Sequence, residues 1–574
     1  MDQREPTKTV DDAAEWPQVE RRKRPRSDEP ASRRASLARL TDKPLDLLVI
    51  GGGIVGAGVA RDAAMRGLRV GLVERGDFAA GTSSRSSRLI HGGLRYLEHG
   101  EIRLVAEALR ERRVLLTIAP HLVWPLAFTF PVHKGDRVSR WKLAAGMWVY
   151  DLLAFSRRLR RHRALGKRGL LEAEPMVRER GLTGGSQYWD AQCDDARLVL
   201  ATARSAIRHG ALMLTYAEVI GLVEEKGRIV GAEVLDRFST ERRVVRAAAI
   251  VNATGPWSDE VRRLETPKAE PLLRLTRGSH VVVPRERLAL NGGVTFTSRV
   301  DGRVMFALPW GAQAYVGTTD DDLAAGESID DVAITRDDLL YLLRSVNAEF
   351  PGAHLTADDV LASWSGLRPL LDNRPNAQAS AVSREHAIVK GKKGMWTVAG
   401  GKLTTYRSMS EDVVNRVMAD LKEIPGRTVK PRAATDTEPL VGGEARDLAP
   451  FREQGLALGL GRDTVRHLLR HYGAETAGIL NLAERRRELL TPIHPSHPAI
   501  AAEVIHHARR ELAHTVSDVL VRRVHLFYET PDRGRAAADT VAQLLGVELK
   551  WDEGRIATEA QRYRNIALAD PVPV

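Results

Sequence analysis

The chain has 574 residues, a formal net charge of +12 and a sequence pI of about 9.8. This length exceeds what one hydrophobic core usually supports, so we expect two or three packed units. A single cysteine, Cys193, excludes an intrachain disulfide framework and a cysteine-based metal cluster. The positive charge is compatible with a nucleic acid, an anionic membrane surface or an anionic small substrate as partner.

Residues 1–43 mix acidic and basic side chains. Acidic residues such as Asp2 and Glu5 precede the basic cluster Arg21–Arg24, which is unlike a signal or transit peptide. We predict that residues 1–43 form a disordered, charged extension. No apolar run approaches the roughly 18 to 20 residues that span a bilayer, so we expect the chain not to cross a membrane.

A nucleotide-binding pattern begins at Leu45, where Leu-Asp-Leu-Leu-Val-Ile predicts a short buried strand. Gly51, Gly53 and Gly56 follow as G-x-G-x-x-G, and a second apolar strand then ends in Glu74. Backbone amides at a helix N-terminus favour a pyrophosphate, and an acid roughly 20 residues further on binds a ribose hydroxyl. The spacing therefore predicts a dinucleotide site, and Glu74 disfavours the 2′-phosphate of NADP.

Two later glycine turns favour FAD over NAD. Residues 251–255 read Val-Asn-Ala-Thr-Gly, and residues 399–404 read Ala-Gly-Gly-Lys-Leu-Thr. Both turns resemble those of two-domain FAD proteins. The cofactor contacts predicted from them are Ala253, Gly255, Gly401, Lys402, Leu403 and Thr404.

Residues 81–98 combine a hydroxyl-rich loop with a His-Gly-Gly triplet and an Arg-Tyr pair. Hydroxyl groups can bond cofactor phosphates and ring heteroatoms, and glycines let the backbone approach a flat ring. Together with Arg75, the cofactor contacts predicted here are Thr82, Ser83, Ser84, Ser87, His91, Gly92 and Gly93.

The segment S-S-x-S-S-x-L-x-H-G-G-L-R-Y-L-E at 83–98 resembles the FAD-dependent, membrane-associated (aerobic) glycerol-3-phosphate dehydrogenases of bacteria. Two departures from that family pattern are present. Arg277 stands where lysine is expected, and the residues at 522–526 read Arg-Arg-Val-His-Leu instead of Arg-Arg-Thr-Arg-Leu. Further matches follow in family order at 278–280, 317–320, 366–370, Arg384 and 400–407.

The resemblance implies FAD as cofactor and oxidation of sn-glycerol 3-phosphate to dihydroxyacetone phosphate by hydride transfer, with electrons passed to a membrane quinone. A buried phosphate dianion needs guanidinium and ammonium groups around it. The substrate-pocket residues implied by the resemblance are Arg95, Tyr96, His280, Arg368, Arg384 and Lys402.

Oxidation of an alcohol also requires a base and a group that stabilises the developing alkoxide. His280 is the first candidate for the base and His91 the second, because imidazole titrates near neutral pH. Arg368 or Lys402 is the candidate stabiliser.

Alternating apolar and helical stretches up to about residue 430 predict an α/β fold with an α+β substrate region. The resemblance implies a Rossmann-like FAD-binding domain of the glutathione-reductase/D-amino-acid-oxidase type. We expect this domain to be interleaved with an antiparallel-sheet substrate domain over 44–435 and followed by a C-terminal helical domain over 436–574. Within that last domain, helices are predicted over 463–472, 474–482 and 497–521.

Residues 137–163 predict an apolar, tryptophan-bearing helix with a basic border at 157–161. This pattern is typical of an interfacial anchor on anionic lipids, and it equally fits a core helix with a solvated basic end. An anchor would place the protein in the cytoplasm, peripherally on the inner face of the cytoplasmic membrane. A homodimer is left open.

No histidine spacing and no calcium-loop motif predicts a metal site. Two other functions remain open from the sequence. One is a glycerol-3-phosphate oxidase that passes electrons to O2. The other is an RNA-modifying flavoprotein, but aromatic residues make up only 5% of the chain and no RNA-binding module is present, so no nucleic-acid partner is expected.

Overall fold

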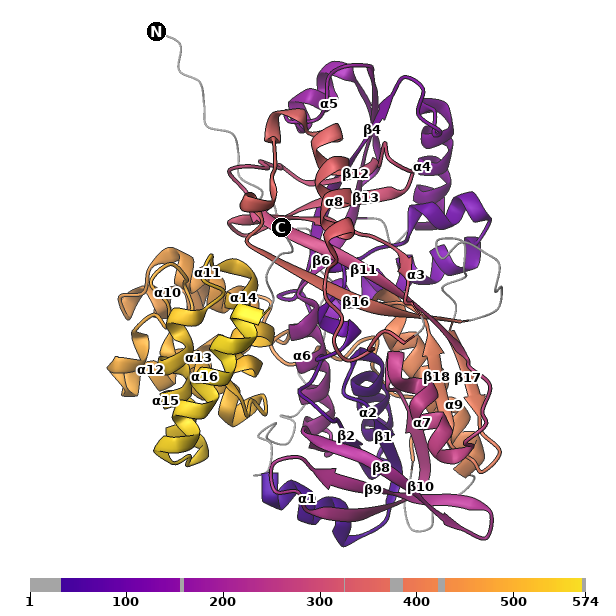
Figure 1. Cartoon of the computed structure of the whole chain (residues 1–574), viewed down its shortest axis with the longest axis vertical. Helices are drawn as coiled ribbons and strands as arrows, with labels where there is room; N and C mark the ends of the chain where they lie inside the picture. The colour runs from indigo at the N-terminus through magenta and orange to yellow at the C-terminus, as the bar shows by residue number, and fades with distance from the viewer. Residues whose placement is uncertain (1–32, 155–158, 325, 372–385, 422–428, 570–574) are drawn as a thin grey trace.

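The computed structural model describes residues 33–154, 159–324, 326–371, 386–421 and 429–569. Two sheets lie one above the other in Figure 1, and the C-terminal helices, in orange and yellow, pack beside them. None of the described helices is both long and apolar enough to cross a bilayer.

The lower sheet contains a parallel core that carries the glycine fingerprint. Its described strands are β1 (Leu45–Ile50), β2 (Val70–Val73), β7 (Leu212–Leu214), β8 (Ala217–Glu225), β9 (Arg228–Asp236), β10 (Arg242–Asn252), β17 (His386–Lys390) and β18 (Trp396–Gly400). The order is β17-β18-β10-β1-β2-β7, in which β18, β10, β1, β2 and β7 run parallel. Strands β8 and β9 pair antiparallel, and β9 joins the sheet through β10.

Strand β1 and helix α2 (Ile54–Arg66) form the first βα unit. Apart from the half-buried Asp46, the residues of β1 are buried, which explains the nearly continuous apolar run in the sequence. Small residues on α2 allow the helix to pack closely on the sheet: a Cβ at Gly56 would collide with the Gly51 carbonyl. Gly67 ends the helix with a left-handed φ of 99°.

Helix α1 (Arg33–Asp42) shows that the prediction of a disordered extension over 1–43 was wrong for its last part. Leu37 and Leu40 are buried in the cluster that contains Leu45 of β1. Arg33 forms an ion pair with Asp236 at 3.0 Å. This short helix has only two leucines among many charged residues, so the sequence pattern did not predict it. Residues 1–32 lie outside the described residues.

The upper sheet is mostly antiparallel, as predicted for the substrate region. Its described strands are β3 (Leu89–Ile90), β4 (Val123–His133), β5 (Arg163–Gly166), β6 (Leu182–Cys193), β11 (Leu273–Pro284), β12 (Gly293–Thr297), β13 (Val304–Trp310), β14 (Gln313–Gly317), β15 (Asp321–Asp322) and β16 (Ala362–Leu371). The order is β15-β11-β14-β13-β12-β4-β6-β3, with β16 beside β11 and β5 beside β6. Only the β12–β4 pair among these runs parallel.

Further helices flank the two sheets and build the C-terminal domain. Those within the first two thirds of the chain are α3 (Ile102–Ile118), α4 (Arg140–Ala154), α5 (Lys167–Ala173), α6 (Asp195–Arg208), α7 (Ser258–Glu265), α8 (Arg336–Glu349) and, slightly later, α9 (Tyr406–Leu421). The C-terminal helices are α10 (Ala449–Ala457), α11 (Arg462–Tyr472), α12 (Thr476–Arg485), α13 (Ala501–Arg510), α14 (Leu526–Glu529), α15 (Ala538–Leu549) and α16 (Glu553–Ala569).

The predicted helix over 497–521 is interrupted. Helix α13 ends at Arg510, and a separate π-helical turn spans Asp518–Arg523. Between them Leu512 has a φ of 51°, and Thr515 and Asp518 exchange hydrogen bonds of 3.0 and 3.1 Å that start the second segment. The apolar periodicity continued through this break, so the sequence pattern did not reveal it.

Candidate active site

A cavity of about 700 Å³, here called the nucleotide cavity, opens where β1, β2, β10 and β18 end and α2 begins. This is the carboxyl edge of the parallel strands, where such sheets bind nucleotides. The predicted cofactor residues that line it are Gly51, Gly53, Glu74, Arg75, Thr82, Ser83, Ala253, Gly255, Gly401, Lys402 and Leu403.

Local geometry at the start of α2 suits a pyrophosphate. Gly53 is the N-terminal cap of α2 and lines the cavity together with Ile54 and Val55, so the positive end of this helix lies at the cavity wall. The backbone is held close to its neighbours, since a Cβ at Gly51, whose φ is 107°, would lie 2.7 Å from the Ala253 carbonyl oxygen. Ile54 N donates to Ser83 Oγ at 3.0 Å, which ties the hydroxyl-rich loop to this helix.

Glu74 links the glycine turn after β1 to the turn after β2. Its two carboxylate oxygens accept hydrogen bonds from Gly52 N at 2.6 Å and from Gly76 N at 2.7 Å. Burial raises the pKa of this carboxyl group, and the two backbone donors oppose the rise. The acid therefore stands at the end of β2, where the sequence predicted a ribose contact.

A second cavity of about 360 Å³, here called the basic cavity, lies under α4. Cationic residues on its wall are Arg137, Lys142, Arg303 and Arg368. Aromatic side chains, among them Phe130, Tyr188 and Phe306, form the apolar part of the wall. The predicted residues that line it are Ser87, His91, Gly93, Tyr96 and Arg368.

Arg368 is fixed by hydrogen bonds before any ligand arrives. Its guanidinium donates to Asp320 Oδ1 at 2.8 Å, to Thr318 Oγ1 at 2.8 Å and to Thr319 O at 3.0 Å. Gly278 on the neighbouring strand leaves room for it, because a Cβ there would lie 2.5 Å from the guanidinium carbon. The family motifs at 278–280, 317–320 and 366–370 thus meet at this one arginine.

The two cavities share a wall. Lys402 lines the nucleotide cavity, and its Nζ lies 3.5 Å from the centre of the Tyr96 ring, which lines the basic cavity. Arg368 and Pro369 face the basic and the nucleotide cavity respectively. A long cofactor in the first cavity is therefore next to a small ligand in the second.

His280, the first candidate for the base, does not line either cavity. It is 2% exposed, stacks on Trp364 with 4.9 Å between ring centres, and lies behind Ser87, whose Oγ is 2.8 Å from Nε2. Burial, together with Arg368 and Arg88, lowers the pKa of His280 well below its ordinary value. The second candidate, His91, is on the wall of the basic cavity.

Several other predicted residues support the walls instead of forming them. Gly92 N donates to Tyr150 Oη at 3.0 Å, and Thr404 Oγ1 accepts from His91 N at 3.2 Å. The predicted cofactor residues that line neither cavity are Gly56, Ser84, Gly92 and Thr404. The side chain of Arg95 and the whole of Arg384 lie outside the described residues.

Sequence reasoning missed Arg303 and the aromatic wall of the basic cavity. Arg303 follows the ordinary turn residues Asp301 and Gly302 and directly precedes β13, and no motif in the sequence marked it. Arg137 and Lys142 fall within the helix predicted over 137–163 and were given no role in a site. Their role in the basic cavity follows from the fold, which lays α4 over the cavity mouth.

Comparison with known families agrees with this geometry. A family model described as FAD dependent oxidoreductase matches residues 46–407, and one described as C-terminal domain of alpha-glycerophosphate oxidase matches residues 433–556. The nucleotide cavity fits FAD: it offers helix-terminal amides at Gly53, hydroxyl groups at Thr82 and Ser83, and backbone approaches that a Cβ at Gly51 would block. The predicted cofactor is thus confirmed.

Curated relatives and solved structures narrow the family. The chain is 38% identical over 541 residues to "Glycerol-3-phosphate dehydrogenase 2" of Mycobacterium tuberculosis, covering 93% of this chain and 90% of that protein. It is 36% identical to "Aerobic glycerol-3-phosphate dehydrogenase" of Bacillus subtilis, with 90% and 93% covered. The structure of the glycerol-3-phosphate dehydrogenase from Bacillus halodurans complexed with FAD superimposes with a TM-score of 0.79 at 31% identity, covering 95% of this chain and 99% of that one. The chain therefore belongs to the FAD-dependent glycerol-3-phosphate dehydrogenase family of oxidoreductases.

Proposed function

We propose that this protein oxidises sn-glycerol 3-phosphate to dihydroxyacetone phosphate in the basic cavity and passes the electrons to a membrane quinone. The observation that carries the proposal is the charge of that cavity. Arg137, Lys142, Arg303 and Arg368 converge on a space of about 360 Å³ that adjoins the nucleotide cavity. A doubly negative phosphate ester matches such a site, because guanidinium and ammonium groups offset its loss of hydration.

Arg368 is the cation held most rigidly on the wall, with its terminal N–H groups bound to protein acceptors that include Asp320. Asp320 and Thr318 orient its planar fork, so little side-chain entropy is lost when a ligand binds. Lys402 lies over the Tyr96 ring on the wall that the two cavities share. Its positive charge is therefore where the substrate would meet the cofactor. There it would stabilise the negative charge that develops on the reacting oxygen.

The reaction removes two groups from the substrate. The C2 hydrogen leaves as a hydride, which FAD accepts when bound, and the C2 hydroxyl proton needs a base. We assign that base to His91, because it lies on the wall of the basic cavity. His280 is assigned a positioning role, since its contact with the cavity runs through the Ser87 hydroxyl at 2.8 Å.

The membrane part of the proposal rests on α4. Its inward face buries Leu143, Met147 and Tyr150, while Trp141, Trp148 and Leu152 are 87%, 65% and 70% exposed on the other side. Exposed tryptophan and leucine next to basic residues fit shallow insertion into an anionic lipid surface. Because α4 also covers the basic cavity, a quinone in the membrane would approach close to the active site, on the inner face of the cytoplasmic membrane.

The substrate assignment is tested by steady-state turnover with a soluble electron acceptor. We expect activity with sn-glycerol 3-phosphate and at least about 1000-fold lower kcat/KM with glycerol, which lacks the phosphate. Arg368→Met should raise KM at least about 10-fold, whereas Arg466→Met, at a side chain 73% exposed in another domain, should not. Equal kcat/KM for the two compounds would refute the assignment.

A further inference from the structure

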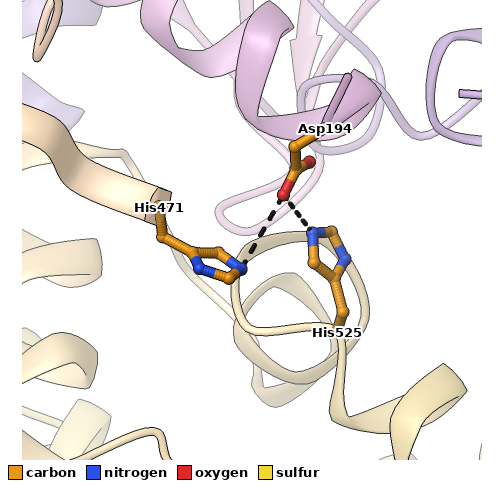
Figure 2. A group of neighbouring side chains, drawn as sticks. All are labelled: Asp194, His471 and His525. Carbon is orange, nitrogen blue, oxygen red and sulfur yellow. Dashed lines mark hydrogen bonds and ion pairs between the residues drawn. The ribbon is translucent and has the colours of Figure 1, made fainter. Parts of the chain in front are cut away.

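A buried group of three donor atoms lies between the FAD-binding domain and the C-terminal helices. Asp194 immediately precedes α6, His471 is the next-to-last residue of α11, and His525 immediately precedes α14. Figure 2 shows both imidazole rings turned toward one carboxylate oxygen. Asp194 Oδ2 lies 2.7 Å from Nε2 of His525 and 3.8 Å from Nε2 of His471. The three donor atoms are all within 4.8 Å of one another.

The opposite nitrogen of each ring faces a backbone carbonyl one helical turn earlier. Nδ1 of His471 lies 2.9 Å from His467 O, and Nδ1 of His525 lies 3.2 Å from Val521 O. A carbonyl oxygen only accepts, so each Nδ1 carries the hydrogen, and the lone pair of a neutral ring is then on Nε2. For His471 this leaves the lone pair on Nε2 facing the carboxylate, whereas Nε2 of His525 forms a hydrogen bond of 2.7 Å with Asp194 Oδ2, so a metal ion would displace the proton of that bond.

His471 lacks the usual means of satisfying that lone pair. Its Nε2 is buried and has no hydrogen-bond partner within the described part of the chain. A neutral imidazole whose lone pair points at a carboxylate is unfavourable unless a cation lies between them.

We propose that Asp194, His471 and His525 bind a divalent transition-metal ion, with zinc as the preferred ion. Zinc takes imidazole and carboxylate ligands at about 2.0 to 2.2 Å, which places neighbouring ligand atoms of a tetrahedral site roughly 3.3 Å apart. The two distances of 2.7 and 3.8 Å bracket that value, and the three ligand atoms all lie within 4.8 Å of one another, so side-chain shifts on the order of an ångström complete the geometry. A water molecule takes the fourth position.

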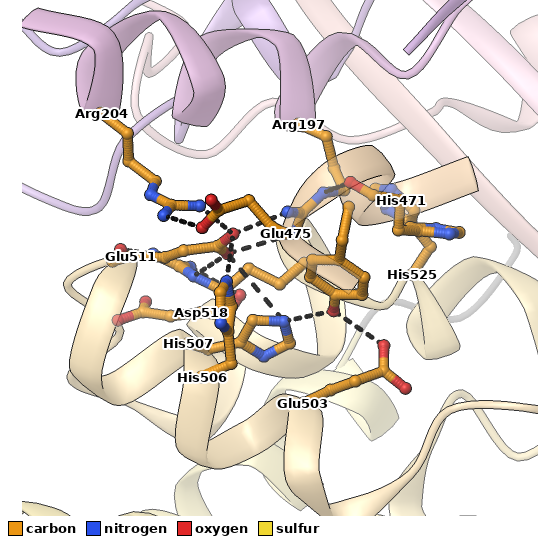
Figure 3. Close-up of polar contacts among 12 residues, drawn as sticks. Arg197, Arg204, His471, Glu475, Glu503, His506, His507, Glu511, Asp518 and His525 are labelled. Carbon is orange, nitrogen blue, oxygen red and sulfur yellow. Dashed lines mark hydrogen bonds and ion pairs between the residues drawn. The ribbon is translucent and has the colours of Figure 1, made fainter. Parts of the chain in front are cut away.

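The surroundings already orient the three ligands. Asp194 Oδ1 accepts from Arg197 N at 3.0 Å at the start of α6, which leaves Oδ2 for the ion. The two Nδ1 contacts fix the tautomer and the ring plane of each histidine, as supporting hydrogen bonds do in known metal sites. Two nearby cations are themselves paired with acids: Arg197 with Glu511 at 2.6 Å (Figure 3) and Arg88 with Asp195 at 3.9 Å, so their repulsion of a metal ion is reduced.

Position 525 is decisive for the proposal. An arginine there would pair with the carboxylate but would offer no lone pair to a metal. The three residues are also far apart in the sequence, so no spacing typical of metal ligands predicted the site. A bound ion would link the FAD-binding domain to α11 and to the start of α14.

The test measures zinc in the full-length, FAD-loaded protein after chelation, reloading with micromolar Zn²⁺ and gel filtration. We expect about one zinc per chain, retained in excess Mg²⁺ or Ca²⁺, and a Tm that rises with zinc. His525→Arg keeps an ion pair with Asp194 and should fold, yet bind zinc at least about 100-fold more weakly, as should His471→Gln. His494→Gln is the matched control, because His494 also pairs with an aspartate, Asp532, at 3.1 Å in the same domain; it should keep the zinc.

Cobalt(II) gives an independent readout, since its visible absorption reports tetrahedral coordination by histidine. The expected spectrum appears in the wild-type protein and in His494→Gln and is lost in His525→Arg. Zinc below about a tenth of an equivalent per wild-type chain, or equal binding by the folded His525→Arg variant, would overturn the proposal. The cluster would then be a metal-free ion pair between Asp194 and a protonated His525.

Discussion

Glu349 is a carboxyl group whose ionisation opposes folding. It is 2% exposed at the end of α8, and burial raises its pKa to about 8, against the lowering effect of Arg178 and Arg299. The folded state therefore holds a proton that the unfolded chain releases near its ordinary pKa of 4.5. Stability from this group is complete below that lower pKa and is lost as the pH rises toward about 8.

We predict that Glu349→Gln removes this pH dependence. The free energy of unfolding of the variant, relative to the wild type, should increase by on the order of a few kcal/mol between about pH 5 and 8. Urea denaturation at several pH values measures it. Glu327→Gln, at an acid whose side chain is 43% exposed, serves as control and should leave the profile unchanged. A constant difference between wild type and Glu349→Gln across this range would contradict the assignment.

The two candidate histidines make distinct kinetic predictions. His91→Asn should lower kcat about 100- to 10,000-fold in FAD-saturated enzyme, because it removes a base at the cavity wall. His280→Asn should act through Ser87. The factors by which His280→Asn and Ser87→Ala each slow flavin reduction should therefore not multiply in the double variant. Stopped-flow reduction of the flavin measures these steps. Full multiplication of the Ser87 and His280 effects would remove His280 from its positioning role.

Helix α4 contributes both to the wall of the basic cavity and to an exposed apolar surface. Its sequence fits both an interfacial anchor and a core helix, and the structure gives it a buried side and an exposed apolar side. Periodicity alone could identify the amphipathic helix. It could not show that Lys142 and Gly146 also reach the basic cavity, because that depends on the antiparallel sheet beneath the helix.

The exposed side of α4 is tested by membrane binding. Trp141→Ser with Leu152→Ser should reduce binding to vesicles that contain phosphatidylglycerol at least about 10-fold, with turnover on a soluble acceptor unchanged. Val547→Ser with Leu568→Ser removes apolar side chains 69% and 58% exposed in the C-terminal domain and is the control. Equal vesicle binding by the two double variants would place the membrane contact elsewhere.

At the scale of the whole molecule, the C-terminal domain forms ion pairs with the loop that follows β2. Arg523 is fully buried and donates to both carboxylate oxygens of Asp77, at 2.8 and 3.0 Å, and Arg522 adds a third contact at 2.6 Å. Burial alone would raise the pKa of Asp77, but the two arginines bring it below its ordinary value. The same loop carries Glu74 and Gly76 of the nucleotide cavity.

Breaking this contact should therefore loosen the cofactor as well as the fold. Arg523→Met leaves a buried carboxylate without its main partner, at a cost of about 3 to 5 kcal/mol, and should lower both Tm and retained FAD. Adding Asp77→Asn should restore part of the stability because the unpaired charge is gone. Calorimetry and flavin absorbance measure the two effects. A stable, FAD-replete Arg523→Met protein would show that the domains are held together by other contacts.

Sequence reasoning reached the parallel nucleotide-binding unit because Gly51, Gly53 and Gly56 must follow a strand at fixed spacing. Arg368 was predicted from the family motif at 366–370. Sequence reasoning could not place His280 behind Ser87, find Arg303, or bring Asp194 to His471 and His525. Those relations depend on strand order and domain docking, which connect residues far apart in the chain.

The most direct test of the proposed activity is the absorbance of the bound flavin under anaerobic conditions on addition of sn-glycerol 3-phosphate, followed by a quinone analogue or air. We predict bleaching of the oxidised-flavin band and recovery that is much faster with the quinone than with air. Rapid recovery in air would indicate an oxidase. No bleaching in a protein that retains FAD would contradict the proposed substrate while leaving the fold and the cofactor site as described.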